Sequence, residues 1–180
     1  MSAKCNIRIN KYNKPSSSIP KSSESFVWKD THWKKIELRL NILQNKIYAA
    51  KKDQNIRKVR KLQRLILNSY DFKKLAVQKV TQLNRGKKTA GVDGISNLNE
   101  KQRVWLVDNL RITGKAHPVR RVMIPKPKGG HRPLGIPTMY DRALQALFVM
   151  ALEPEFEAIF EENSYGFRPG RSPIDAMKQI

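Results

Sequence analysis

The sequence predicts a predominantly helical α+β protein, on the strength of three observations. Apolar residues recur at intervals of three and four through most of the chain beyond residue 30, the period of helices packed on a core. One pair of strand-like runs flanks Gly129-Gly130, as in a β-hairpin. The hydrophobic fraction of 39% over 180 residues is enough for a modest core, in one domain or in one domain with an appended arm.

Residues 1–25 are rich in Ser, Lys, Asn and Pro and predict a disordered basic arm. Residues 1–23 hold five basic residues and no acid, so an organellar transit peptide is the alternative. Order is expected to begin near Phe26 and Trp28. Asp30 or Thr31 is positioned to cap the first helix. That helix runs from Trp33, with one face made of Ile36, Leu40, Leu43, Ile47 and Ala50.

A second helix is expected over residues 56–69, after a turn at residues 51–55. Its inward face comprises Ile56, Val59, Leu62, either Leu65 or Ile66, and Ser69. Cations crowd the remaining positions, with no acid between Asp53 and Asp71 to pair with them. These cations are Arg57, Lys58, Arg60, Lys61 and Arg64. We expect an external anion to neutralise them, and a solvated face is the alternative.

A third helix is expected from Asp71 to Asn84, and a fourth over residues 99–111. The inward side chains of the third are Phe72, Leu75, Ala76, Val80 and Leu83. Between the two helices, residues 86–96 break all periodicity, and Asp93-Gly94 is a turn signal.

Residues 120–142 contain the expected hairpin, which carries Lys126, Lys128 and Arg132 at its tip. Gly129-Gly130 supplies the positive φ angles of a tight turn. Such a tip can close over a polyphosphate, and a solvated basic loop is the alternative.

A fifth helix is expected to begin near Thr138. It is apolar on most sides, so we expect deep burial, with Phe156, Ile159 and Phe160 on the buried side of its acidic end. Residues 164–173 are predicted as a loop, and Pro173 opens a last short helix. Because little of the sequence follows that helix for it to pack against, we expect the chain to be a piece of a longer protein. A natural C-terminus is the alternative.

Basic side chains outnumber acidic ones by 36 to 15, a net charge of +21. Residues 1–90 hold 23 basic and 5 acidic side chains, so the first half is the expected binding surface for RNA or DNA. A membrane is disfavoured because no basic helix has a wide apolar face. Cys5 is the only cysteine, which excludes an internal disulfide. No secretory signal is evident, and Asp93, Asp108, Asp141 and Asp175 show no metal-site spacing.

Three blocks of sequence together resemble a known family. They are GKKTAGVDGIS (86–96), the helical segment 33–84, and residues 120–176 with the runs RPLGIPT and YGFRPGRS. The chain closely resembles the N-terminal part of group II intron-encoded proteins, the bacterial and organellar reverse transcriptase–maturases. A retron or diversity-generating lineage fits these long runs less well.

The resemblance implies a helical N-terminal domain that binds RNA (26–97), followed by the fingers and the start of the palm of a right-hand polymerase (98–180), an incomplete domain. Lys126 and Arg132 would contact the phosphates of the incoming dNTP, with Arg120 and Arg142 supporting that pocket or the template. The residues implied to bind intron RNA and template–primer are Arg57, Lys58, Arg60, Lys61, Arg64, Lys87, Lys88, Phe167 and Arg168.

The family's Mg²⁺-binding aspartates, two of them in a YxDD turn, have no counterpart in this sequence. The resemblance therefore implies Mg²⁺ for a full-length enzyme with palm, thumb and maturase domains, and none for this chain alone. Two functions stay open: part of an RNA-directed DNA polymerase, or a non-catalytic maturase-type fragment that assists splicing. The implied compartment is a bacterial cytoplasm or an organellar matrix.

Overall fold

The computed structural model describes Trp28 and residues 31–179 of the chain. The expected arm at residues 1–25, Phe26 and Asp30 lie outside the described residues. The helices are α1 (Trp33–Lys52), α2 (Ile56–Asn68), α3 (Tyr70–Gln78), a π-helix (Lys79–Leu83), a 3-10 helix (Arg85–Lys88), α4 (Glu100–Asn109), α5 (Met139–Glu157) and α6 (Pro173–Lys178). The strands are β1 (Arg120–Pro125) and β2 (His131–Ile136). This is the predominantly helical α+β class that the sequence predicts.

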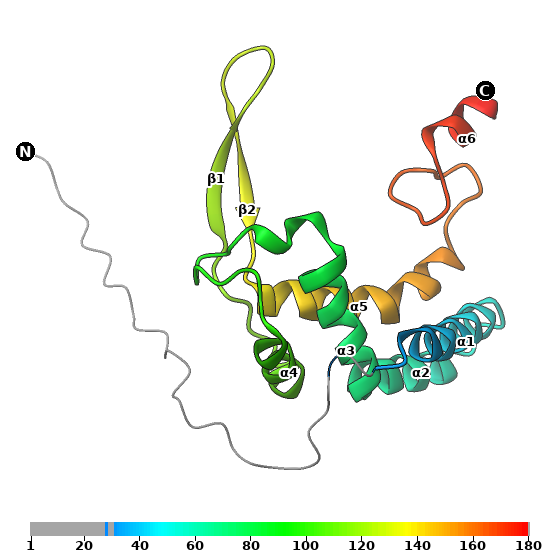
Figure 1. Cartoon of the computed structure of the whole chain (residues 1–180). Coiled ribbons are helices and arrows are strands. Elements are labelled where there is room, and N and C mark those ends of the chain that lie inside the picture. Colours follow the sequence, from blue (N-terminus) through cyan, green and yellow to red (C-terminus); the bar gives the residue numbers. More distant parts are fainter. Residues whose placement is uncertain (1–27, 29–30, 180) are drawn as a thin grey trace, which may run out of the picture.

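Helix α5 is the centre of the fold, because α1, α2 and α3 all pack against it (Figure 1). Its inward face meets the face predicted for α1 and most of the face predicted for α2, where Ile66 rather than Leu65 is buried. Ile56 was also expected on the inward face of α2, but it is 38% exposed, since it lies in the first turn, beyond the part of α2 that α5 covers. The largest fully buried side chains are Phe72, Ile47, Ile66, Leu110, Met139, Leu147, Val59, Val77 and Val107.

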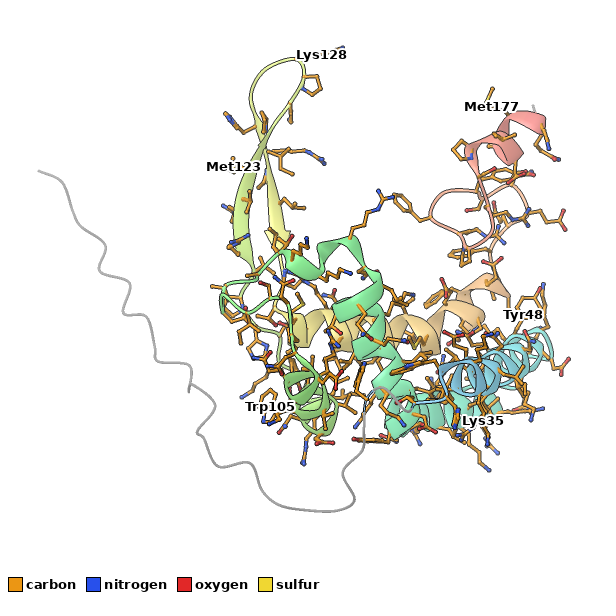
Figure 2. The ribbon with its side chains drawn as sticks, in the orientation of Figure 1. Lys35, Tyr48, Trp105, Met123, Lys128 and Met177 are labelled. Carbon is orange, nitrogen blue, oxygen red and sulfur yellow. The ribbon has the colours of Figure 1, made fainter. Side chains whose placement is uncertain are left out.

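The hairpin stands away from the helices, with Lys128 at its far end (Figure 2). Its strands pair antiparallel, in a register that places Arg120 opposite Ile136 and Ile124 opposite Arg132. At the turn, the Lys126 N–H donates to Gly130 O at 3.0 Å, and both glycines have positive φ. The predicted turn chemistry is confirmed.

The start of α1 differs from the expectation. His32 is the N-cap residue and makes no side-chain capping hydrogen bond. The hydroxyl of Thr31 is buried and makes no hydrogen bond within the described part of the chain, so Thr31 does not cap the helix. The prediction for Thr31 is wrong because the helix begins one residue later than its capping position requires.

Leu83 was expected to face inward and is instead 67% exposed. After Gln78 the helix widens into a π-turn, in which the Asn84 N–H donates to Lys79 O, five residues back. Each turn then holds more residues than in an α-helix, so the i, i+3 relation between Val80 and Leu83 is lost.

The second half of α5 is less buried than expected. Phe156, Ile159 and Phe160 were assigned to its buried side, but they are 46%, 56% and 47% exposed. Val149 and Leu152 are also exposed, and together with Phe156 and Phe160 they line an open apolar groove along the end of α5. Apolar composition alone does not decide burial, because a helix is buried only where another element covers it.

Pro154 lies inside α5 and is buried. Proline has no N–H, so the carbonyl of Met150, four residues earlier, receives no donor from it. The side-chain amide of Gln44 on α1 donates to that carbonyl at 3.0 Å. One turn later, the Glu155 carboxylate accepts from Lys51 Nζ and Gln63 Nε2, each at 2.7 Å. Polar side chains of α1 and α2 therefore hold α5 at its proline.

Candidate nucleic-acid and nucleotide interface

The five cations of α2 form an exposed basic row on the second helix. Val59 and Ile66 point the other way, into the core. Within the described residues, the row's side chains make no ion pair or hydrogen bond, although Arg60 lies close enough to Glu155 to help lower the pKa of that carboxyl. This basic row consists of Arg57, Lys58, Arg60, Lys61 and Arg64. A row of exposed cations along one helix is suited to a phosphate backbone.

The hairpin presents a second group of exposed cations. Lys126 and Lys128 lie in the turn, as expected. Arg132 does not lie at the tip: it is in β2, paired with Ile124, because the turn closes between Lys126 and Gly130. Cross-strand partners share one face of a hairpin, so Arg132 and Arg120 lie on the same face, at opposite ends.

Arg142 is placed differently from the other predicted cations. Its guanidinium donates to three backbone carbonyls: Pro137 O at 3.0 Å, Gly86 O at 3.0 Å and Thr89 O at 2.7 Å. Partial burial lowers its pKa, opposed by the nearby carboxylate of Asp93. Arg142 thus joins the base of the hairpin to the loop at residues 86–94.

The same loop carries Lys87 and Lys88. The Lys87 ammonium donates to Gln82 O at 2.9 Å, which ties it to the end of the π-helix. Lys88 is exposed. The predicted turn at Asp93-Gly94 is confirmed, since Gly94 has a φ of +71° and the Asp93 carboxylate accepts from the Ile95 N–H. Of the two lysines, Lys88 is therefore the one available to a ligand.

Phe167 and Arg168 are neighbours with opposite environments. Phe167 is fully exposed and has a φ of +60°, an uncommon conformation for a residue with a side chain. Arg168 is buried and donates to the Glu157 carboxylate through Nη2 at 2.6 Å and Nε at 3.1 Å. Its Nη1 donates to the carbonyls of Glu161 and Ser164. Arg168 stabilises the loop through these hydrogen bonds, whereas the Phe167 side chain is accessible to a partner.

The described part of the chain contains no group of three or more His, Cys, Asp or Glu side chains placed to hold a metal ion. Nor does any described helix have the length and apolarity needed to cross a membrane.

Sequence reasoning missed the residues that hold these surfaces in place. Asp141 is buried and accepts hydrogen bonds from His117 and Thr138, yet in the sequence it is one of several unremarkable aspartates. The one local signal was Thr138 three residues before Asp141, the spacing of an N-terminal capping pair.

Comparisons with known proteins agree with the resemblance. Residues 28–110 match the family model described as the N-terminal domain of reverse transcriptase. The chain is 38% identical over 101 residues to the group II intron-encoded protein LtrA of Lactococcus lactis, covering 54% of this chain and 17% of LtrA. It is 40% identical over 109 residues to protein YkfC of Escherichia coli, covering 57% of this chain and 28% of that protein.

A third relative, the maturase-like protein 1 of Euglena gracilis, is 32% identical over 139 residues, covering 76% of this chain and 30% of that protein. The chain thus spans less than a third of the length of each of these relatives. Together, the matched domain and these relatives support the assignment of this chain to the N-terminal region of the group II intron reverse transcriptase–maturases.

Proposed function

We propose that this chain is the RNA-binding and fingers portion of a group II intron reverse transcriptase. In this proposal the basic row of α2 binds intron RNA and template–primer, and the hairpin closes on the incoming dNTP. The observation that carries the proposal is the pair of exposed cationic surfaces, the basic row on α2 and the cations of the hairpin.

The hairpin supplies a chemically suitable partner for a triphosphate. Lys126, Lys128 and Arg132 lie within one short segment and are exposed. Preorganised cations directed at phosphate oxygens stabilise the charge that develops in phosphoryl transfer. In a complete enzyme, Mg²⁺ held by residues outside this chain would neutralise charge on the transferring phosphates. The palm, thumb and maturase domains would be its further partners, and no residue described here is proposed as a metal ligand.

The second candidate is a maturase-type fragment that binds intron RNA without polymerisation. It is favoured by the similarity to a protein named maturase-like. Both candidates require RNA binding, and only the first requires nucleotide binding at the hairpin. Both are compatible with a bacterial cytoplasm or an organellar matrix, which therefore stays a prediction.

The test of RNA binding uses a triple variant, Lys58→Ala with Arg60→Ala and Arg64→Ala. We expect the affinity of the wild-type chain for a structured intron RNA to fall steeply with salt, and the triple variant to lose up to about three units of the slope of log K against log [salt]. Binding is measured by filter retention at several KCl concentrations, and helicity by circular dichroism.

The matched control, Lys101→Ala with Lys115→Ala and Lys178→Ala, removes the same charge from scattered exposed positions. It should leave the salt slope nearly unchanged. An affinity that does not depend on salt, or equal losses in both triple variants, would refute a specific role for the α2 row. Crosslinking of a photoreactive dNTP to the hairpin then separates the two candidates, since a maturase-only fragment predicts none.

A further inference from the structure

The first turn of α5 touches three segments that are distant in the sequence. Tyr140, Asp141 and Arg142 are consecutive, and each side chain reaches a different segment. These segments are the chain just after α4, the chain entering β1, and the loop at residues 86–94. We call these three residues the clasp.

Asp141 holds the chain that enters the hairpin. Its buried carboxylate accepts from the backbone N–H of His117 at 3.2 Å, and its Oδ2 lies 3.1 Å from His117 Nδ1. The hydroxyl of Thr138, which caps α5, donates to the same carboxylate at 2.8 Å. The incoming and outgoing ends of the hairpin are thus joined through one side chain.

Tyr140 reinforces this junction from its other side. Its ring packs edge-on against the His117 ring, with centroids 5.5 Å apart. Its hydroxyl donates to Arg111 O at 2.8 Å and accepts from the Arg111 N–H at 3.1 Å. The segment between α4 and β1 is therefore fastened at both of its ends.

Arg142 holds the loop, through the three carbonyls described above. The same loop also lies directly against Thr138, the N-cap residue of α5. A Cβ added to Gly91 would lie 2.8 Å from Thr138 Cα and 2.9 Å from Pro137 O, so only glycine fits there. Loop and hairpin base are thus in direct backbone contact.

The hairpin has little other support. Among the described residues, β1 and β2 pack chiefly on each other, and the hairpin projects clear of the helices in Figure 1. A two-stranded hairpin alone is marginally stable in water. The direction in which it points is consequently determined at its base.

We propose that the clasp fixes the hairpin and the 86–94 loop in one orientation, so that Asp141 and Arg142 act as positioning residues for nucleotide and template binding. That nucleotide and template are the ligands rests on the function proposed above. Arg142 then acts through its hydrogen bonds to the backbone, and its charge does not contact a phosphate directly.

The Arg142→Lys variant separates the two roles of this residue. Lysine keeps the positive charge, but its ammonium lacks the planar fork that reaches the carbonyls of Gly86, Thr89 and Pro137 together. A phosphate contact would survive this change in large part, whereas the clasp would not.

The first measurement is of distances between spin labels on the full chain with Cys5→Ser. One label is placed at Asn45→Cys on α1, and the other at Lys128→Cys in the hairpin turn. Asp141→Ala should widen the distance distribution about twofold, as the hairpin samples more orientations. Arg121→Gln, which removes an exposed hairpin cation outside the clasp, should not change it.

Arg142→Lys is measured in the same way, with the second label at Val92→Cys in the loop, and should widen that distribution about twofold. Helicity is followed by circular dichroism, so that a variant that fails to fold is recognised. For such a variant, Asp141→Asn or Arg142→Gln is measured instead. Unchanged distributions in folded variants would overturn the proposal.

The second measurement is of template–primer affinity. Arg142→Lys is expected to weaken it about tenfold, with the salt slope unchanged, because no phosphate contact is lost. Wild-type affinity in Arg142→Lys would overturn the positioning role. If the wild-type chain binds no template–primer, the proposed function fails, while the label distances still test the clasp.

Discussion

Gln44 on α1 supplies the hydrogen bond that Pro154 cannot give to α5, and its removal has a calculable cost. The amide of Gln44 lies 3.0 Å from Met150 O, across 106 residues of sequence. Met150 is 5% exposed, so water does not readily replace the amide. The perturbation is Gln44→Ala.

The expected magnitude follows from the carbonyl left without a donor. Leaving a buried backbone acceptor unsatisfied costs about 1–3 kcal/mol. Alanine is a good helix former, so the substitution adds no penalty from helix propensity at position 44. We therefore expect Gln44→Ala to lower the free energy of unfolding by about 1–3 kcal/mol.

The assay is urea denaturation followed by circular dichroism, in a double-mutant cycle with Pro154→Ala. Alanine at 154 restores the N–H that can donate to Met150 O. In that background Gln44→Ala should cost no more than about 0.5 kcal/mol. Asn45→Ala, at an exposed neighbouring position, is the control and should be nearly neutral.

Equal costs of Gln44→Ala in the two backgrounds would refute the reasoning. A cost of Gln44→Ala no greater than that of Asn45→Ala would also refute it.

Two further predictions concern the loop and the response to acid. Gly91→Ala should destabilise the chain by about 1–3 kcal/mol, because its Cβ would meet the backbone of Thr138, whereas Gly166→Ala, with open space around it, should be near neutral in thermal melts. The hydrogen bond from Lys51 lowers the pKa of Glu155 below its ordinary value of 4.5. The stability that this ion pair gives the fold is therefore present above pH 4.5 and is lost as the pH falls through the lowered pKa. The melting temperature of the wild type should therefore exceed that of Glu155→Gln at pH 7, and the gap should close below about pH 4.5; a gap independent of pH would contradict the ion pair.

Most helix positions and the hairpin could be predicted from the sequence, because their causes are local. The faces of α1 and α2 follow from apolar spacing, and Gly129-Gly130 provides the positive φ that the turn requires. The predictions that Leu83 and Phe156 face inward were wrong for different reasons. A π-turn moved Leu83 to the exposed side, and no element in the described part of the chain covers Phe156.

The sequence by itself determined the basic charge, the helical α+β class and the family resemblance, since composition, period and motif are properties of the linear chain. Only the tertiary structure decided which cations are free and which are structural. Arg142 and Lys88 look alike in the sequence, yet Arg142 binds carbonyls 53 and 56 residues away, whereas Lys88 stays exposed. Hydrogen-bond partners so far apart are brought together by the packing of α5 against the earlier helices, and no local spacing encodes that.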